Sequence, residues 1–312
     1  MMSDNVKKEK VKFEVLSGVV GQETKLQKVF RKVPPVIMLC MAWLLFMFIV
    51  AVFWEQFAPF DYEEQDLANR LSIPKIFGGT DTVHFLGTDS LGRDLLSRLI
   101  RSIRTSLLVA FCGTIITAVL GTALGFVAAH FRGWVDEAIM MMVDFQYSLP
   151  FMILALLVIA FFGNNLVFFV FLLGIEGWNK YARMSRGMAL SAQNNGYAVA
   201  IRQLGASPVR LYTKHILPNV SNILIVELTL NFPAKILAET SLSFLGLGIQ
   251  PPDTSLGSLL SFGRAYMMTN WWLAVIPGLT IFLTTLSTKK AVLSASAPPR
   301  CSTMPTSCWK TW

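Results

Sequence analysis

Tyr197-Ala-Val-Ala-Ile-Arg-Gln-Leu-Gly-Ala-Ser-Pro-Val-Arg-Leu-Tyr-Thr-Lys-His-Ile-Leu-Pro218 is the stretch around which the chain is organised. It lies between strongly apolar segments, and residues 180–214 carry six Lys or Arg and no Asp or Glu. Small apolar residues alternate with polar ones at helical spacing until Gly205 and Pro208 interrupt the pattern. Because basic loops are retained on the cytoplasmic side of a membrane, we expect a short helix outside the bilayer on that side, and then a second helix that enters the membrane at Pro218.

The composition excludes an ordinary soluble protein. Of the 312 residues, 54% are hydrophobic, whereas soluble domains contain roughly 45–50%. Several uninterrupted apolar runs approach the ~20 residues that are needed to cross ~30 Å of hydrocarbon. The net charge of +8 is gathered beside the apolar runs, so it does not indicate nucleic-acid binding.

The sequence contains no pattern that indicates covalent chemistry. The four cysteines form neither a disulfide framework nor a metal site, and His84, His130 and His215 lack ligand spacing. A Gly-Lys-Ser/Thr phosphate loop is absent from the sequence, so the chain is not itself a P-loop ATPase. We therefore predict no catalytic residue, no cofactor and no metal site, and a protein that is not itself an enzyme.

The N-terminal third divides into three predicted parts. Residues 1–33 carry eight Lys or Arg against four acids and form a basic segment inside the cell. Residues 34–54 follow as a retained first span, because the apolar run is longer than the ~7–15 residues of a signal-peptide core. Residues 55–104 are expected to form an extracytoplasmic loop and a pre-helix, since seven acids face two bases in residues 55–92.

Two glycine-centred turns, Gly87-Thr-Asp89 and Gly92-Arg-Asp94, precede a basic amphipathic segment within this loop. Two interpretations remain open: a solvated turn before a helix, or a recognition element.

Residues 105–287 are predicted to hold five further spans. Their expected ranges are 107–129, 138–162, 165–181, 216–238 and 272–287. In the second span a small residue recurs every fourth position, a stripe that lets another helix approach closely. Packing within the chain is favoured over a subunit interface for this stripe, which consists of Gly113, Thr117, Gly121 and Gly125.

The stretch 197–218 resembles the coupling (EAA) loop of ABC-importer permeases, in which Glu-Ala-Ala is followed after three residues by Gly and further on by Leu-Pro. The matching positions are Val199, Ala200, Ile201, Gly205, Leu217 and Pro218. The sequence departs from the family pattern at two of them, because Val199 replaces the glutamate and Ile201 the second alanine.

Two more blocks are similar to the dipeptide, oligopeptide and nickel branch of these permeases. One is residues 85–98, of the form Gly-Thr-Asp-x-x-Gly-Arg-Asp-x-x-Ser-Arg, and the other is residues 236–278. The Gly-rich run that ends in Pro251-Pro252 cannot be one straight helix, so residues 236–252 are predicted to fold back as a re-entrant or outer-surface segment. Leu256 stands where a tryptophan is usual in the family.

The resemblance implies an all-α polytopic membrane protein with six transmembrane helices, a type I permease fold and a cytoplasmic coupling loop at 183–215. It implies a bacterial inner-membrane location with both termini cytoplasmic. The implied partners are the lipid bilayer, a second homologous permease, two ABC ATPase subunits that hydrolyse ATP, and an extracytoplasmic substrate-binding protein. The residues implied to couple to the ATPase are Tyr197, Val199, Ala200, Ile201, Leu204, Gly205, Ala206, Ser207, Leu217 and Pro218.

The implied function is ATP-driven import of short peptides. Nickel or glutathione-like cargo, or a non-functional remnant of such a permease, are the alternatives. A secondary carrier is disfavoured because the sequence lacks an inverted repeat with broken helices and paired intramembrane carboxylates.

Three polar residues inside predicted spans are candidates for the translocation path: Asp144, Glu227 and Asn231. A structural hydrogen-bonding role is favoured for Asp144, because it lies near one end of its span. Family members carry an arginine three residues earlier, where this chain has Met141, so an ion pair of that kind is missing here. For Glu227 a pore-facing and a buried position are weighed equally. Lys235 is expected to snorkel to the membrane surface.

The tail 288–312 does not fit the rest of the chain. It has no helical period, a Pro298-Pro299 pair, and two cysteines with two tryptophans near its end. A reading-frame shift near residue 288 is one interpretation, and a natural basic tail is the other. The frame shift predicts that another frame of the gene encodes a continuation of the Leu-Leu-Gly-Asp type, and sequencing would contradict it if neither frame does.

Overall fold

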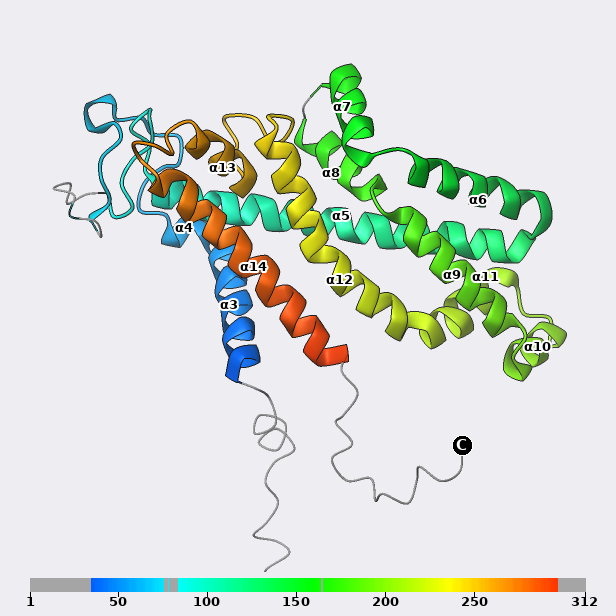
Figure 1. The fold of residues 1–312 in the computed structure, drawn as a ribbon. Coiled ribbons are helices and arrows are strands. Elements are labelled where there is room, and N and C mark those ends of the chain that lie inside the picture. The colour runs from blue at the N-terminus through cyan, green and yellow to red at the C-terminus, as the bar shows by residue number, and fades with distance from the viewer. Residues whose placement is uncertain (1–34, 76–77, 79–83, 164, 297–312) are drawn as a thin grey trace, which may run out of the picture. The chain divides into compact units, whose positions relative to one another are not determined.

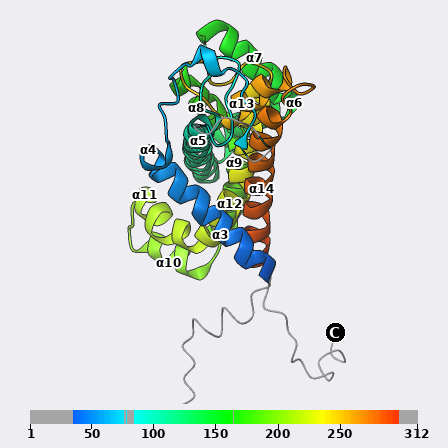
Figure 2. The ribbon, with the colours of Figure 1, turned by 90° about the vertical axis from the view of Figure 1, so that its left-hand side faces the viewer.

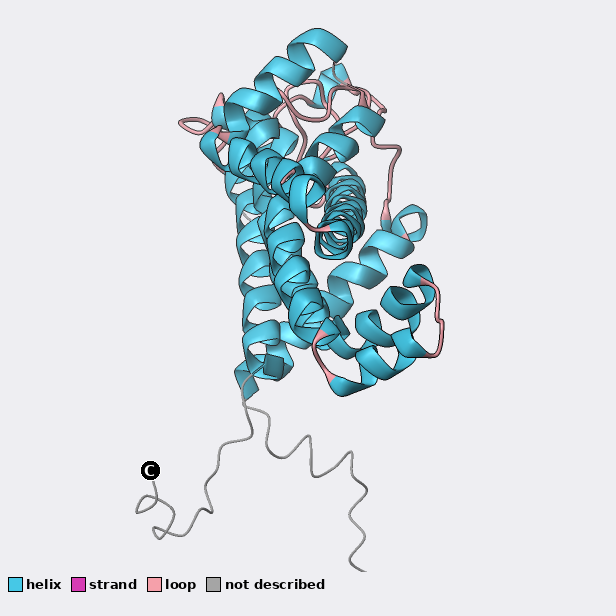
Figure 3. Ribbon diagram, turned by 90° about the vertical axis from the view of Figure 1, so that its right-hand side faces the viewer, coloured by secondary structure: helices cyan, strands magenta, loops and turns pink. Residues whose placement is uncertain are grey.

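The computed structural model describes residues 35–75, 78, 84–163 and 165–296. All the regular secondary structure of these residues is helical (Figures 1 and 3). The chain divides into two units between Leu39 and Cys40, and every contact described below lies within the second unit. The helices are α3 (Pro35–Val52), α4 (Trp54–Phe57), η1 (Leu67–Asn69), α5 (Leu95–Phe131), α6 (Gly133–Ser148), α7 (Phe151–Phe162), α8 (Leu166–Ile175), α9 (Trp178–Gln193), α10 (Gly196–Gln203), α11 (Pro208–Arg210), η3 (Leu211–Ile216), α12 (Leu217–Phe244), α13 (Leu256–Arg264) and α14 (Trp272–Ser296).

Four helical segments of the described chain are long and apolar enough to cross a membrane: α3, α5, the continuous run 208–244, and residues 272–293 of α14. The pair α6 and α7 would make a fifth span, but it is bent by 95°. The bend lies at Leu149-Pro150, because proline disfavours a helical conformation of the residue before it. The predicted span 138–162 is therefore broken instead of continuous.

The predicted span 165–181 is also interrupted. Helix α8 has 10 residues, about 15 Å of helix and half the hydrocarbon thickness. The chain then turns at Glu176 and Gly177, where Gly177 has a φ of +82°, before α9 begins. Six full spans are consequently not established by length and composition.

Helix α5 is the element on which the second unit is built, and α6, α8, α9, α12 and α13 all pack against it. Figure 2 shows this helix nearly end-on among its neighbours. It begins at Leu95, so the predicted pre-helix is its first part. The Asp94 side chain caps it by accepting from the Ser97 backbone N–H at 2.7 Å.

The turn motif before α5 is buried. The Asp89 carboxylate accepts hydrogen bonds from the backbone N–H groups of Leu91 and Arg93, at 2.8 and 3.0 Å, and pairs with the Arg93 and Arg98 side chains. Gly92 has a φ of +76°, and a Cβ there would lie 1.7 Å from the Asp66 carbonyl oxygen. The motif therefore organises the start of α5, and the solvated-turn interpretation is wrong.

The small-residue stripe of α5 packs within the chain, as predicted. Gly113 lies against Leu173 of α8, and Gly121 lies against the Trp178 carbonyl and Tyr181 of α9. Because Gly121 has no side chain, α9 approaches the α5 backbone directly. At Gly113 the packing is looser, since a Cβ there would lie 3.4 Å from Leu173 Cβ.

Helix α12 continues to Phe244, beyond the predicted end at 238, so the first half of the predicted re-entrant segment is helix. The chain turns after Leu245, and a capping box at Ser255 starts α13. Glu239 anchors this turn from a buried position, because its carboxylate accepts from Ser106 Oγ of α5 at 3.1 Å and from Ser243 Oγ at 2.8 Å.

Helix α14 extends to Ser296, so residues 288–296 continue the last span, contrary to the prediction of a non-helical tail after 287. The Thr288 hydroxyl donates to the Thr284 carbonyl at 2.7 Å, as in the turns before it. Residues 297–312 lie outside the described part of the chain.

The close approach at Gly121 can be tested with one methyl group. In Gly121→Ala the new Cβ would lie 2.4 Å from both the Trp178 oxygen and Tyr181 Cβ, so we expect the free energy of unfolding in detergent to fall by about 1–3 kcal/mol. The control is Gly187→Ala on α9, where nothing lies within 4 Å and stability should stay equal or rise by up to ~1 kcal/mol. Equal values for the two variants would contradict the packing described above.

Candidate functional site: a polar cleft beside the interrupted helices

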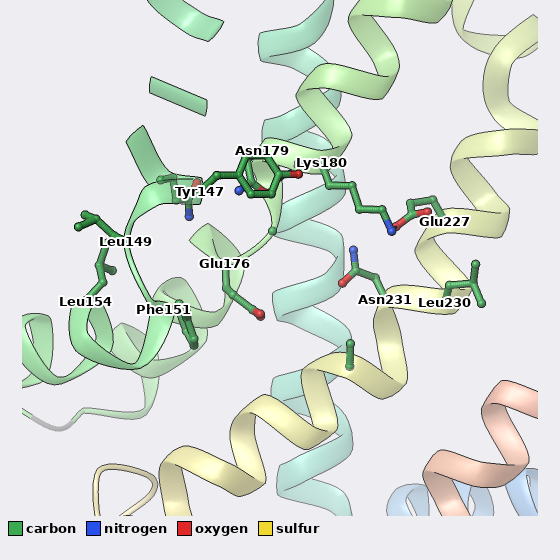
Figure 4. Close-up of a pocket in the computed structure, with 13 residues that line it drawn as sticks. Tyr147, Leu149, Phe151, Leu154, Glu176, Asn179, Lys180, Glu227, Leu230 and Asn231 are labelled. Atoms are coloured by element: carbon green, nitrogen blue, oxygen red, sulfur yellow. Dashed lines mark hydrogen bonds and ion pairs between the residues drawn. The ribbon is translucent and has the colours of Figure 1, made fainter. Parts of the chain in front are cut away.

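A cleft of about 370 Å³ lies where the two interrupted helix pairs meet α12 (Figure 4). Its apolar wall comes mainly from the α6–α7 bend, and its polar wall from the α8–α9 break and α12. The lining residues are Gln146, Tyr147, Leu149, Phe151, Leu154, Glu176, Gly177, Asn179, Lys180, Glu227, Leu230, Asn231 and Ala234.

An ion pair crosses this cleft. Lys180 extends from the first turn of α9 towards α12, and its Nζ lies 2.6 Å from Glu227 Oε1. The side chain of Lys180 is 59% exposed and that of Glu227 is 11% exposed. Asn231 lies one turn beyond Glu227 on the same face of α12 and also lines the cleft.

The break between α8 and α9 is held by side chains of three other helices. Lys235 Nζ of α12 donates to the Leu173 carbonyl at 2.6 Å, and it also donates to the Glu176 carbonyl. Thr117 of α5 donates to the Gly174 carbonyl at 2.8 Å, and Gln146 of α6 donates to the Ile175 carbonyl at 2.9 Å. The last carbonyls of a helix have no partner within it, and an unpaired carbonyl is costly in hydrocarbon, so these four donor contacts stabilise the break.

Lys235 also forms an ion pair with Glu176, at 2.7 Å between Nζ and Oε2, and its side chain is 0% exposed. The expectation that Lys235 snorkels to the surface is therefore wrong. The last carbonyl groups of α8 and the Glu176 carboxylate accept hydrogen bonds from the Lys235 ammonium group inside the protein, as water would at the membrane surface.

The basic residues of α9 are paired with acids of other helices. Lys180, Arg183 and Arg186 recur every third residue, a spacing that keeps them near one side of a helix. Their partners are Glu227 of α12 and Asp144 and Asp136 of α6, in that order.

The three predicted path residues are not brought together. Glu227 and Asn231 line the cleft, whereas Asp144 does not, because it is exposed and pairs with Arg183. The cation beside Asp144 is therefore Arg183 of α9. Sequence reasoning did not single out the other polar residues that line the cleft, Gln146, Glu176, Asn179 and Lys180, nor the contact of Lys235 with Glu176.

Most of the predicted coupling residues lie on a helical hairpin, residues 196–210, which consists of α10 and α11 and follows the C-terminal end of α9. Residues 197–201 belong to α10, which ends as the glycine pattern predicts: the Ala206 N–H donates to the Ile201 carbonyl at 3.3 Å, and Gly205 has a φ of +78°. Ser207 caps α11 by accepting from the Arg210 N–H at 3.4 Å. The helix runs on from Pro208 to Phe244, so Pro218, with Leu217, lies inside it and does not start it.

The hairpin is partly packed and partly exposed. Ala198 is buried in a cluster with Leu211 and Tyr212 of η3 and with residues of α9 and α12. Three large apolar residues of the same segment are exposed: Leu204, at 86%, and Val199 and Val209. Ala200 is exposed, and Ile201 and Ala206 are half-buried. The Tyr197 side chain lies outside the described part of the structure.

These features define a helical membrane protein with a polar, charge-paired cleft between interrupted helices and an exposed basic hairpin. Residues 121–289 match the family described as binding-protein-dependent transport system inner membrane component. The oligopeptide transport system permease protein OppC of Mycobacterium tuberculosis is 37% identical over 245 residues, 78% of this chain and 82% of that protein. The chain belongs to this family and is a multi-pass inner-membrane component.

Further relatives extend the comparison. The di/tripeptide transport system permease protein DppC of Pseudomonas aeruginosa is 38% identical over 78% of this chain and 82% of its own length. The glutathione transport system permease protein GsiD of Pectobacterium atrosepticum is 33% identical over 77% and 78%. A solved structure of the MetNI methionine ABC transporter in an inward-facing conformation aligns with a TM-score of 0.48 and 19% identity, over 64% of this chain and 97% of that one.

The role of Lys235 predicts a large effect on stability. Lys235→Met nearly preserves the volume but removes the donor to Leu173 and Glu176, so we expect the free energy of unfolding in detergent to fall by about 3–5 kcal/mol. Arg183→Met is the control, because it breaks an exposed pair and should change stability by less than about 1 kcal/mol.

A second substitution separates the charge from the packing. Glu176→Gln added to Lys235→Met removes the unpaired carboxylate and should recover part of the loss. A double variant no more stable than Lys235→Met would show that the ion pair is not what the lysine contributes.

Proposed function

We propose that this chain is a permease subunit of an ATP-driven, binding-protein-dependent importer of short peptides, and that it forms half of the translocation path. The observation that carries the proposal is the polar cleft, found in a chain that belongs to a transport family. Peptide cargo is supported by the relatives named as oligopeptide and di/tripeptide permeases. Neither of these two relatives is named for nickel, the alternative cargo.

In this proposal the cleft is part of the path, with Glu227 and Asn231 on its wall. The charged groups in it are neutralised in pairs, Lys180 with Glu227 and Lys235 with Glu176. Apolar residues on the facing wall, Leu149 and Phe151 among them, complete the lining. Such a surface gives a polar peptide hydrogen-bonding partners in the membrane without an uncompensated charge.

The hairpin 196–210 is proposed as the docking element for the ATPase subunits. Val199, Leu204 and Val209 are large apolar side chains left exposed along this segment, and their burial against a partner subunit would be favourable. The hairpin packs on α9 and on the helix that becomes α12, and both helices line the cleft. Movement of the docked hairpin would therefore reach the cleft through two helices, as in a rigid-body switch.

The remaining parts of the assembly follow from the same proposal. Partner ATPases hydrolyse ATP, an extracytoplasmic binding protein delivers the cargo, and a second homologous permease completes the path. Six membrane crossings with both termini cytoplasmic require that α6–α7 and α8–α9 each count as one interrupted span. Glutathione-like cargo is the second candidate, because GsiD is named for glutathione.

Gly205 gives a direct test of coupling. Proline fixes φ near −65°, whereas Gly205 has a φ of +78°, so Gly205→Pro should distort the hairpin while the membrane helices still insert. In the reconstituted complex we expect substrate-stimulated ATP hydrolysis to be lost.

Gly163→Pro is the matched control. Gly163 has a φ of +76° and also has nothing within 4 Å of its missing Cβ, but it ends α7, away from the hairpin in sequence. Its stimulated hydrolysis should persist. A Gly205→Pro complex that is stimulated as strongly as the unmodified complex would remove the docking role from the hairpin.

A further inference from the structure

The two ion pairs of the cleft differ in what a passing molecule can reach. Lys235 is completely buried and holds the α8–α9 break, so its pair with Glu176 is structural. Lys180 is 59% exposed and spans the cleft to Glu227. A molecule in the cleft therefore meets the ammonium group of Lys180 and, behind it, the carboxylate of Glu227.

Stability alone does not account for Lys180. Removing Lys180 would leave the Glu227 carboxylate, 11% exposed, without its partner. The Lys180 side chain is itself 59% exposed, however, and among the described residues no backbone carbonyl accepts from its Nζ as those of Leu173 and Glu176 accept from Lys235. What Lys180 does change is the electrostatic potential of the cleft, because without it the Glu227 carboxylate would stand alone in a confined, partly apolar space.

We propose that Lys180 and Glu227 are the specificity-determining pair of the cleft: by neutralising each other, they make it indifferent to the charge of the cargo's side chains. The inference rests on the proposed peptide function and specifies which peptides pass. A single unpaired charge in a narrow cleft attracts cargo of the opposite sign and repels cargo of the same sign. With the pair intact, acidic, basic and neutral peptides encounter the same neutral wall.

The pair is positioned for this role by the interruption of the span. Because α8 ends at Ile175 and α9 begins at Trp178, Lys180 lies in the first turn of α9 and its side chain leaves that turn towards α12. Glu227 meets it from the middle of α12, and Leu230 and Asn231 adjoin the same wall. A straight helix through 165–193 would have no break at which the cleft could form.

The test uses the complete reconstituted importer and three tripeptides that differ only in charge: Ala-Ala-Ala, Ala-Lys-Ala and Ala-Glu-Ala. The quantity measured is the ratio of Ala-Lys-Ala to Ala-Glu-Ala uptake, relative to the unmodified complex with the same binding protein. In Lys180→Met this ratio should rise at least about tenfold, and in Glu227→Gln it should fall by a similar factor, as expected of a cleft lined by one sign of charge.

The charge exchange Lys180→Glu with Glu227→Lys should return the ratio close to that of the unmodified complex, which a merely structural role would not predict. Arg186→Met is the matched control, because it removes a cation of the same helix whose partner, Asp136, lies outside the cleft lining, and its ratio should not change.

Three outcomes decide the matter. An unchanged ratio in Lys180→Met and Glu227→Gln, with Ala-Ala-Ala uptake intact, overturns the inference while the peptide function stands. Equal loss of all three peptides in every cleft variant, the exchange included, shows that the pair is structural and also overturns it. If the unmodified complex imports none of the three peptides, the proposed function itself fails.

Discussion

The last carbonyl groups of a helix have no partner within it, and the end of α8 shows how this chain supplies donors for them. Lys235, Thr117 and Gln146 reach the same break from α12, α5 and α6. These donors make the break independent of water, which hydrocarbon does not supply. The carbonyl groups at the end of α8 therefore hold α5, α6 and α12 together at one point.

That requirement depends on close packing elsewhere. Thr117 reaches the Gly174 carbonyl where α8 approaches α5 closely, because Gly174 lies against Ile116 and a Cβ there would lie 2.5 Å from Ile116 Cγ2. Gly121 of the α5 stripe permits the approach of α9, since a Cβ there would lie 2.4 Å from the Trp178 oxygen. Close helix packing and the hydrogen bonds at the α8–α9 break therefore depend on each other. Together they stabilise the interruption beside which the polar cleft lies.

The sequence predicted the parts of the fold that rest on local patterns. The long apolar helices, the glycine end of α10 and the packing of the small-residue stripe within the chain follow from spacing and composition. The breaks at 149–150 and 176–177 were missed, although a proline stands at the first, because an apolar run of about twenty residues also fits an uninterrupted helix. The ion pairs were missed for another reason: Glu227 lies 47 positions after Lys180 (227 − 180), so no local pattern connects them. Lys235 was placed at the surface from its position in the span alone, and the acid that keeps it inside comes from another helix.

The cations of α9 bear on two properties of the chain. The orientation of a loop is set by its Lys and Arg, and acids contribute little to that choice. In the topology proposed above, Lys180, Arg183 and Arg186 therefore count fully towards the orientation, even though each has an acidic partner in the folded chain. Pairing neutralises them across three helices. In the folded protein these three pairs form a polar contact between α9 and the helices α6 and α12. Lys180 lies at one end of this contact and is the cation of the three that lines the cleft.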